Sequence, residues 1–94
     1  MTRHRGWVRS PDVAFVDDGV RVALVDLREV NSTRPVILLD SAAAIWRILG
    51  EVNDQAEIVE RVATHFNTEA PRVEADVKRF LDELGGHGYA VATA

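Results

Sequence analysis

Apolar and polar residues alternate with a period of two in the early part of the chain, which is the pattern of half-buried β-strands. One face of the run Val20–Leu27 carries apolar residues at every second position, namely Val20, Val22 and Leu24. A shorter apolar run, Val13–Val16, comes before it, and Asp17-Asp18-Gly19 separates the two runs. Because Asp-Gly tolerates the positive φ angles of tight turns, this segment predicts a β-hairpin.

A third strand is predicted at Val36–Leu39, where four aliphatic residues follow Pro35. The segment 28–34 has no apolar period and is predicted to be the turn that returns the chain for this strand. Asp40 or Ser41 then offers a side-chain oxygen as the N-cap of a helix, so the strand and the helix are joined almost without a loop. A strand fixed in this way can offer a rigid backbone edge to a peptide, if that edge is unpaired.

From Ser41 onward the apolar period changes from two to 3.6 residues, which predicts three helices. The first carries its apolar stripe at Ile45, Ile48 and Leu49, and Gly50 is a candidate left-handed cap. The second begins at Asp54, where Asp54 and Glu57 form a capping-box-like pair, and it extends for about three turns. Its stripe consists of Ile58, Val62 and Phe66, widened by Val59 and Ala63.

The third helix is predicted to be capped by Asn67 and Thr68, and it accommodates Pro71 because a first-turn residue needs no N–H donor. Gly85-Gly86 should stop it. Its apolar residues recur at helical spacing as Val73, Val77, Phe80, Leu81 and Leu84. The tail around Tyr89 either adds a small strand or covers the core. Three strands followed by three helices predict an α+β fold.

Composition limits the functional classes. Ninety-four residues with 47% apolar content predict one small globular domain, here residues 11–94, behind a flexible arm over residues 1–10. No apolar run is long enough for a membrane span or a secretory signal, so a cytoplasmic location is expected. The absence of cysteine removes thiolate catalysis and thiolate metal sites. A net charge of −4 disfavours nucleic acid as a partner.

Two segments of the chain resemble the PqqD-like peptide-binding domains, also called RiPP recognition elements, which have a winged helix-turn-helix shape. They are Leu39–Leu49, which reads LDSAAAIWRIL, and Asp76–Leu84, which reads DVKRFLDEL and is followed by Gly88-Tyr89. The resemblance covers Val13–Val91. The chain departs from the family pattern in two places, since the turn 28–34 lacks a glycine and Asp40 stands where asparagine is frequent.

The resemblance implies that the chain binds the leader segment of a ribosomally made precursor peptide. The leader would add as an antiparallel strand to the third strand and lie in the groove between that strand and the third helix. An unpaired edge beside an amphipathic helix is also the geometry that strand addition requires. The implied pairing strand consists of Val36, Ile37 and Leu38. The implied helix side of the groove consists of Val73, Asp76, Val77 and Phe80. Alternate strand residues face opposite sides, and the sequence leaves open which of them touch the peptide.

Several of these residues also have a purely structural interpretation. Val77, Leu81 and Leu84 are expected in the core, Phe80 is either buried or on the groove floor, and Asp76 is either a solvated carboxylate or an anchor for the leader. Trp46 is expected in the core or on the groove wall. The three histidines, His4, His65 and His87, lack the spacing of metal ligands, so neither a metal nor a cofactor is expected.

The resemblance favours a stand-alone, non-catalytic and monomeric protein of a lasso-peptide pathway, because its hairpin sequence is similar to those proteins. The partners would then be a separate leader peptidase and a macrolactam cyclase. One alternative is a peptide chaperone of pyrroloquinoline quinone biosynthesis. A second is a winged-helix DNA-binding protein, which the charges of the third helix argue against. Between Pro71 and Leu84 these are Arg72, Lys78 and Arg79 against Glu74, Asp76, Asp82 and Glu83.

Overall fold

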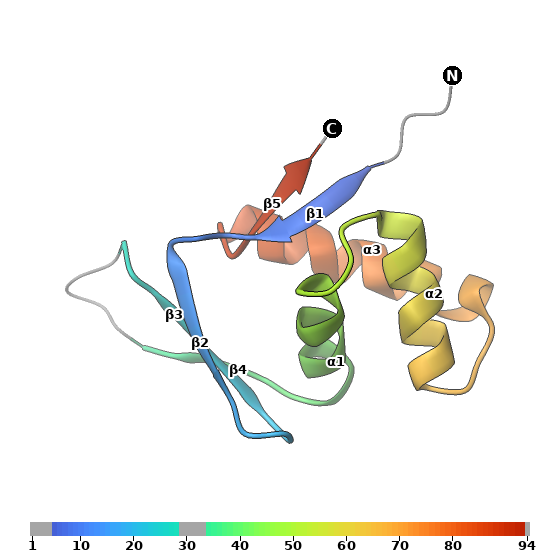
Figure 1. The fold of residues 1–94 in the computed structure, drawn as a ribbon, viewed down its shortest axis with the longest axis horizontal. Helices are drawn as coiled ribbons and strands as arrows, with labels where there is room; N and C mark the ends of the chain where they lie inside the picture. Colours follow the sequence, from blue (N-terminus) through green and yellow to red (C-terminus); the bar gives the residue numbers. More distant parts are fainter. Residues whose placement is uncertain (1–4, 29–33, 94) are drawn as a thin grey trace.

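The computed structural model describes residues 5–28 and 34–93, which form two small sheets and three helices. Their arrangement is drawn in Figure 1. The first four residues, including His4, lie outside the described residues, and so do residues 29–33 of the predicted turn 28–34. The elements in chain order are β1 (Gly6–Arg9), β2 (Val13–Asp17), β3 (Val22–Asp26), β4 (Val36–Leu38), α1 (Asp40–Leu49), α2 (Gln55–His65), α3 (Ala70–Gly86) and β5 (Ala90–Thr93). The predicted α+β class is confirmed.

The strands β2, β3 and β4 form an antiparallel sheet in that order, as the period-two pattern predicted. Its inner face packs on the helices, because Val22 and Leu24 of the central strand are completely buried. The hairpin turn is held by its aspartates. The Asp17 carboxylate accepts a hydrogen bond from the Gly19 amide at 2.9 Å. Val20 differs from the prediction, since it lies in the turn with 71% of its surface exposed.

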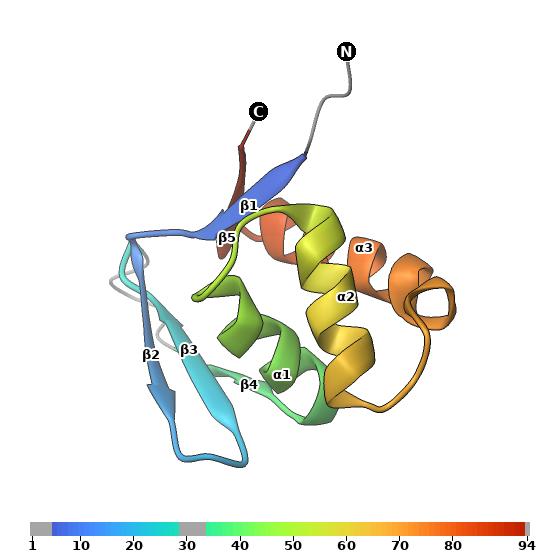
Figure 2. The same ribbon diagram turned by 45° about the vertical axis from the view of Figure 1, so that its right-hand side comes forward.

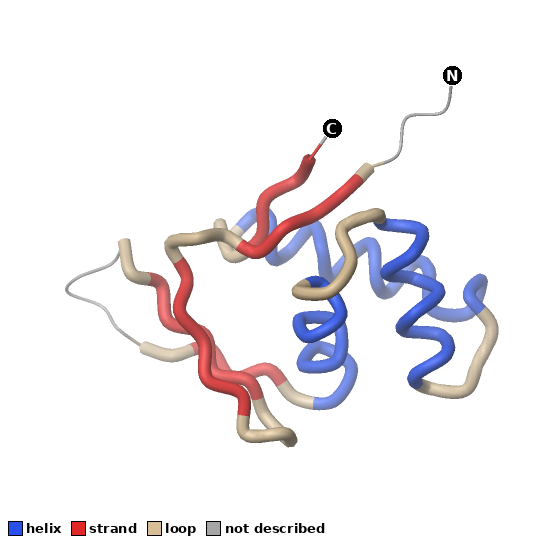
Figure 3. The backbone as a smooth tube through the Cα atoms, viewed as in Figure 1, coloured by secondary structure: helices blue, strands red, loops and turns tan. Residues whose placement is uncertain are grey.

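A second sheet joins the two ends of the described chain. Strand β1 pairs antiparallel with β5, with Trp7 opposite Ala92, so the tail does add a strand (Figure 3). Trp7 is only 3% exposed, and its indole N–H donates to the side-chain oxygen of Gln55 at 3.0 Å. The prediction of a loosely held arm over residues 1–10 is therefore wrong for β1, because burial of an indole and pairing with a distant strand fix this segment.

The N-terminus of α1 differs from the prediction. Its N-cap is Leu39, which makes no side-chain cap, and Asp40 is the first helical residue with a φ of +49°. Neither Asp40 nor Ser41 therefore acts as the predicted cap. At the other end, Gly50 has a φ of −77°, so it is not a left-handed cap either. The carbonyl oxygen of Trp46 in the last turn accepts instead from the Arg9 guanidinium at 2.6 Å.

The ends of α2 and α3 confirm some predictions and correct others. The Asp54 side chain accepts from the Glu57 amide at 3.1 Å, which confirms the predicted cap of α2. The N-cap of α3 is Glu69 rather than Asn67 or Thr68, while Pro71 does lie in the first turn. The helix ends at Gly86, as the glycine pair predicted.

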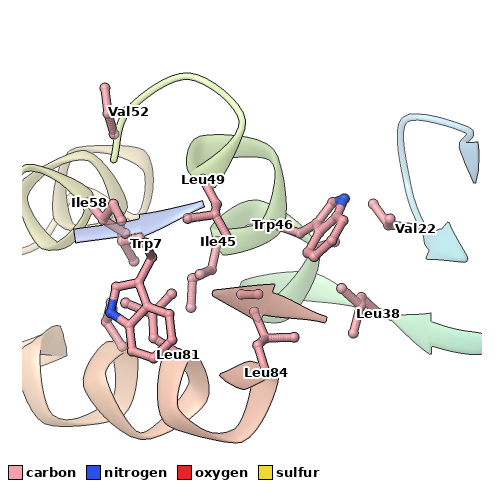
Figure 4. Close-up of a cluster of buried hydrophobic side chains, with 14 of the residues drawn as sticks. Trp7, Val22, Leu38, Ile45, Trp46, Leu49, Val52, Ile58, Leu81 and Leu84 are labelled. Carbon is pink, nitrogen blue, oxygen red and sulfur yellow. The ribbon is translucent and has the colours of Figure 1, made fainter. Parts of the chain in front are cut away.

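The three helices lie on one side of the three-stranded sheet, and the core fills the space between them (Figure 2). Trp46 of α1 is 0% exposed and lies between the sheet residues Val22 and Leu38 and the rest of the core (Figure 4). Leu81 and Leu84 of α3 join the same cluster, as predicted. None of the described helices is long and apolar enough to cross a membrane.

We expect Trp7→Ala to lower the free energy of unfolding by about 3 to 5 kcal/mol, because it empties a large buried site and removes the bond to Gln55. Urea denaturation followed by circular dichroism measures this change. The matched control is Val20→Ala, which should change stability by less than about 0.5 kcal/mol because Val20 is 71% exposed. A cost below about 1 kcal/mol for Trp7→Ala would show that β1 unfolds separately from the core.

Candidate peptide-binding site

The candidate site begins at the outer edge of β4. Within the described residues β4 pairs only with β3, and it is the last strand of its sheet, so its other edge has no backbone partner there. A free edge presents N–H and C=O groups in the spacing that another strand needs. The predicted pairing strand, Val36–Leu38, therefore has the backbone geometry for strand addition.

The structure also shows which residues of β4 face which side. Leu38 is 5% exposed and belongs to the core, and Val36 is half-buried against the same cluster. Ile37 points to the opposite face of the sheet and is 49% exposed. The side chains of an added strand would alternate in the same way. Those on the helix side would lie toward the groove, and those beside Ile37 would lie on the outer face of the sheet.

A cleft of about 440 Å³ lies beyond the end of β4, where α1, α3 and the C-terminal part of α2 meet. The four residues predicted for the helix side of the groove all belong to α3, and all of them line this cleft. Its lining residues are Ser41, Ala42, Ile45, Val62, Phe66, Val73, Asp76, Val77, Arg79, Phe80 and Glu83. The strand residues do not line it, but Ser41 is only three residues after Leu38. The edge and the cleft are thus consecutive along the chain, and they are joined by Leu39, which is 50% exposed.

The four helix residues differ in what they can offer. Val77 is 1% exposed, so it is a core residue at the floor of the cleft. Val73 and Phe80 are half-buried and pack against the core while facing the cleft. Asp76 is exposed, and its carboxylate accepts from Arg79 at 2.9 Å. The cleft therefore has an apolar floor and a charged rim.

Ile45 and Phe66 also line the cleft, although no sequence pattern assigned them to it. Both were predicted on apolar helix stripes, and a stripe alone does not show which of its residues lie at the border of the core. Phe66 is 43% exposed and follows the last turn of α2, so it reaches the cleft from a helix that was not considered part of the groove. Its exposure is the signal that identifies it, and only the structure gives it.

Arg9 fixes the sheet against α1. Its guanidinium carbon lies 4.5 Å from the centre of the Phe15 ring and 4.9 Å from that of Trp46, so the cation lies against both aromatic rings. It also donates two hydrogen bonds to the Trp46 carbonyl oxygen, at 2.6 and 3.2 Å. Burial lowers the pKa of Arg9, and the nearby Asp17 carboxylate opposes that shift. These contacts join β1, β2 and α1 and thereby set where the β4 edge lies.

A two-point ion pair reinforces this arrangement. Arg47 of α1 donates to both carboxylate oxygens of Asp17 at the end of β2, at 2.7 and 2.8 Å. The hydrogen bonds from Arg47, followed by the one from the Gly19 amide, lower the pKa of Asp17 to about 2. The same bonds raise the pKa of Arg47. The end of the hairpin is therefore tied to α1 while Asp17 is ionised.

Catalytic and metal-binding groups were not expected. The described residues contain no group of three or more His, Cys, Asp and Glu side chains that could hold a metal ion. His65 and His87 are exposed and lie against neighbouring rings, 4.8 Å from Phe66 and 5.6 Å from Tyr89. Both therefore have ordinary aromatic partners at the surface.

Comparison with known protein families gives a match over residues 21–90 to the family described as coenzyme PQQ synthesis protein D (PqqD). This match spans well over half of the chain. The chain belongs to the PqqD family. The resemblance noted in the sequence is thereby confirmed, and the match includes β3, β4 and the three helices that build the edge and the cleft.

The fold of this PqqD-family chain is similar to a solved structure described as "TbiB1 in Complex with the TbiA(beta) Leader Peptide". The TM-score is 0.76 at 24% sequence identity, and the alignment covers 89% of this chain and 94% of the other. A search of curated protein sequences gave no significant match. The similarity in structure establishes the fold of the chain.

We expect the Asp17–Arg47 pair to make the stability of this PqqD-family protein depend on acid pH. An aspartate whose pKa is about 2 when folded and about 4 when unfolded stabilises the fold above pH 4, and this contribution is lost as the pH falls to 2. The stability difference between wild type and Asp17→Asn should therefore shrink over that range, as measured by urea denaturation at several pH values. In an Arg47→Gln background the Asp17→Asn difference should vary much less with pH. A difference that is constant from pH 7 to pH 2 would contradict this role.

Proposed function

We propose that this chain binds the leader segment of a ribosomally made precursor peptide by adding it as an antiparallel strand to β4. The observation that carries the proposal is the unpaired β4 edge, which ends three residues before the first residue of the cleft formed by α1, α2 and α3. Membership of the PqqD family and a fold shared with a protein solved in complex with a leader peptide support it. The edge would align the peptide backbone, and the cleft would select side chains.

The few backbone hydrogen bonds that β4 can make are too weak in sum for tight binding by the edge alone. Alternate residues of an antiparallel strand point their N–H and C=O groups outward, so a three-residue strand offers about two to four hydrogen bonds. At about 1 kcal/mol each, these give about 2 to 4 kcal/mol, whereas micromolar binding needs about 8 kcal/mol. The cleft must supply the difference. We therefore assign Val73 and Phe80 to contacts with an apolar leader residue, and Val77 to the floor beneath it.

Asp76 is assigned to the rim of the same cleft. It is already paired with Arg79, and both side chains are 72% exposed, so exchange of that partner for a basic leader residue would cost little. A charge in this place favours one orientation of the peptide more than it adds affinity. Asp76 would thus contribute to the choice of leader, with the apolar floor giving most of the binding energy.

The pathway assignment follows the hairpin sequence, which is similar to free-standing proteins of lasso-peptide pathways. In that role the chain acts without catalysis, as a monomer in the cytoplasm, and presents the precursor to a separate leader peptidase and a macrolactam cyclase. The family description favours the alternative, a peptide chaperone in the synthesis of pyrroloquinoline quinone. Binding of one precursor and not the other, in matched assays, decides between the two.

Fluorescence polarisation with a labelled leader peptide tests the cleft. Phe80→Ala should weaken binding at least tenfold, because it removes a ring that faces the cleft. Val73→Ser should have the same direction with less loss of core packing, and circular dichroism checks that both variants are folded. The control is Asp82→Ala, an exposed residue of α3 that does not line the cleft and should bind as wild type. Wild-type affinity in both cleft variants would place the leader elsewhere.

The edge is tested through the peptide, which leaves the protein unchanged. Leader peptides that each carry one N-methylated amide should lose affinity with a period of two along the segment that pairs with β4. The reason is that only alternate N–H groups of an added strand point toward its neighbour. A loss of about tenfold or more is expected at the bonded positions and little change between them. Equal loss at successive positions, or none, would contradict strand addition.

A further inference from the structure

A second hollow, of about 600 Å³, lies between α1 and α2, and it shares no lining residue with the cleft of the candidate site. Its apolar side chains include Ala44, which is 3% exposed, and Ile48, which is half-buried. We call this hollow the α1–α2 groove. Its lining residues are Ala44, Arg47, Ile48, Glu51, Glu57, Glu60, Arg61, Thr64 and His65.

The α1–α2 groove adjoins the cleft at the C-terminal end of α2. The helices α1 and α2 run in opposite directions, so this end lies beside the N-terminal end of α1 (Figure 2). Consecutive residues face different hollows there, since His65 lines the groove and Phe66 lines the cleft, with their ring centres 4.8 Å apart. On α1, Ala44 and Ile45 are divided between the two hollows in the same way. A chain that leaves the cleft past Phe66 therefore reaches the groove.

The direction of the added strand decides which part of a leader arrives at this point. Strand β4 runs toward α1, and the cleft lies beyond its C-terminal end. A strand that pairs antiparallel with β4 runs the other way, so its N-terminal end points toward the cleft. The leader residues in the cleft are therefore upstream of the paired ones. Residues that continue past Phe66 are further upstream and lead to the α-amino group of the precursor.

The charge of the groove suits an amino terminus. Three glutamates and two arginines line it, and Arg47 already donates to both carboxylate oxygens of Asp17. Arg61 donates to Glu51 at 3.2 Å, whereas Glu60 forms no ion pair within the described residues. The groove thus keeps an excess of negative charge. A free α-amino group, with an ordinary pKa of about 8, is mostly a cation at pH 7.

Tethering allows a contact as small as this one to form. From His65 back to Glu57, α2 rises about 12 Å, which about four residues of extended chain span. So short a segment cannot offset the cost of association by itself. Once the β4 edge and the cleft hold the rest of the leader, its upstream residues are present at the groove at an effective concentration on the order of millimolar. A separate chain has no such advantage, which favours the leader itself as the occupant.

We propose that the α1–α2 groove holds the amino-terminal end of the leader, with its ammonium group beside Glu60. This inference rests on the proposed leader binding and extends the bound segment from the β4 edge through the cleft into the groove. The choice of leader then depends on its length upstream of the cleft residue. About two extended residues are needed to pass from His65 to Glu60, and acidic residues among them would be repelled.

The test combines truncation of the leader with a change of charge in the groove. The leader of the precursor encoded beside this gene carries fluorescein at its C-terminal end, which leaves the α-amino group free. Its affinity is measured by fluorescence polarisation at pH 7 and low salt, for the whole leader, its N-acetylated form and a series shortened by one N-terminal residue at a time. The variants are Glu60→Lys and the matched control Asp82→Lys, which changes an exposed residue of α3 that lines neither hollow.

In wild type we expect two steps along the series, a loss of at least fivefold as the upstream residues are removed and a second loss at the cleft residue. Acetylation should weaken binding about threefold. Glu60→Lys should weaken the whole leader at least fivefold but bind the leader without its upstream residues within twofold of wild type, which also shows that the variant is folded. Asp82→Lys should stay within twofold for both forms.

A series with only the step at the cleft residue, or an equal loss for long and short leaders in Glu60→Lys, overturns this inference and leaves the proposed function intact. If no form of the leader binds to wild type, the proposed function is wrong and this inference falls with it.

Discussion

The position of the three-stranded sheet on α1 is the constraint on which the rest of the structure depends. Trp46 fills the space between the sheet and the helices, and Arg9 lies against both its ring and that of Phe15 while it donates to a carbonyl oxygen in the last turn of α1. The Asp17–Arg47 pair holds the far end of the hairpin to the same helix. An edge strand of three residues carries too little structure of its own to stay in place, so its geometry is imposed by these contacts.

Sequence patterns predicted those elements of the fold whose conformation is determined by residues close together in the chain. The hairpin, the three helices and the Asp54 cap follow from residues close together in sequence, and all were predicted. The pairing of β1 with β5 was missed because its strands are four residues long and lie at opposite ends of the chain. The cap predicted at Asp40 or Ser41 is absent: Asp40 is the first helical residue, and the short passage from β4 into α1 gives it a positive φ angle, which side-chain preference does not reveal.

The residues of the candidate site were likewise predicted only in part. The sequence implied Val73, Asp76, Val77 and Phe80 as the helix side of the groove through the family resemblance alone, and the structure gathers all four at one cleft. It did not identify Phe66 or the role of Arg9, because each depends on contacts between elements far apart in sequence. The direction of Ile37 also required the strand register, since a shift by one residue would reverse it.

The short length of β4 reduces the tendency of its open edge to recruit other chains. Long, flat and open strand edges recruit other chains without selection, and proteins usually shorten or interrupt them. Here the edge is three residues long and follows Pro35, which has no amide hydrogen to offer. A random extended segment would gain too few backbone bonds to stay attached. Only a segment whose side chains also fit into the neighbouring cleft would remain bound. The small number of hydrogen bonds at the edge therefore protects the protein from pairing with unrelated chains.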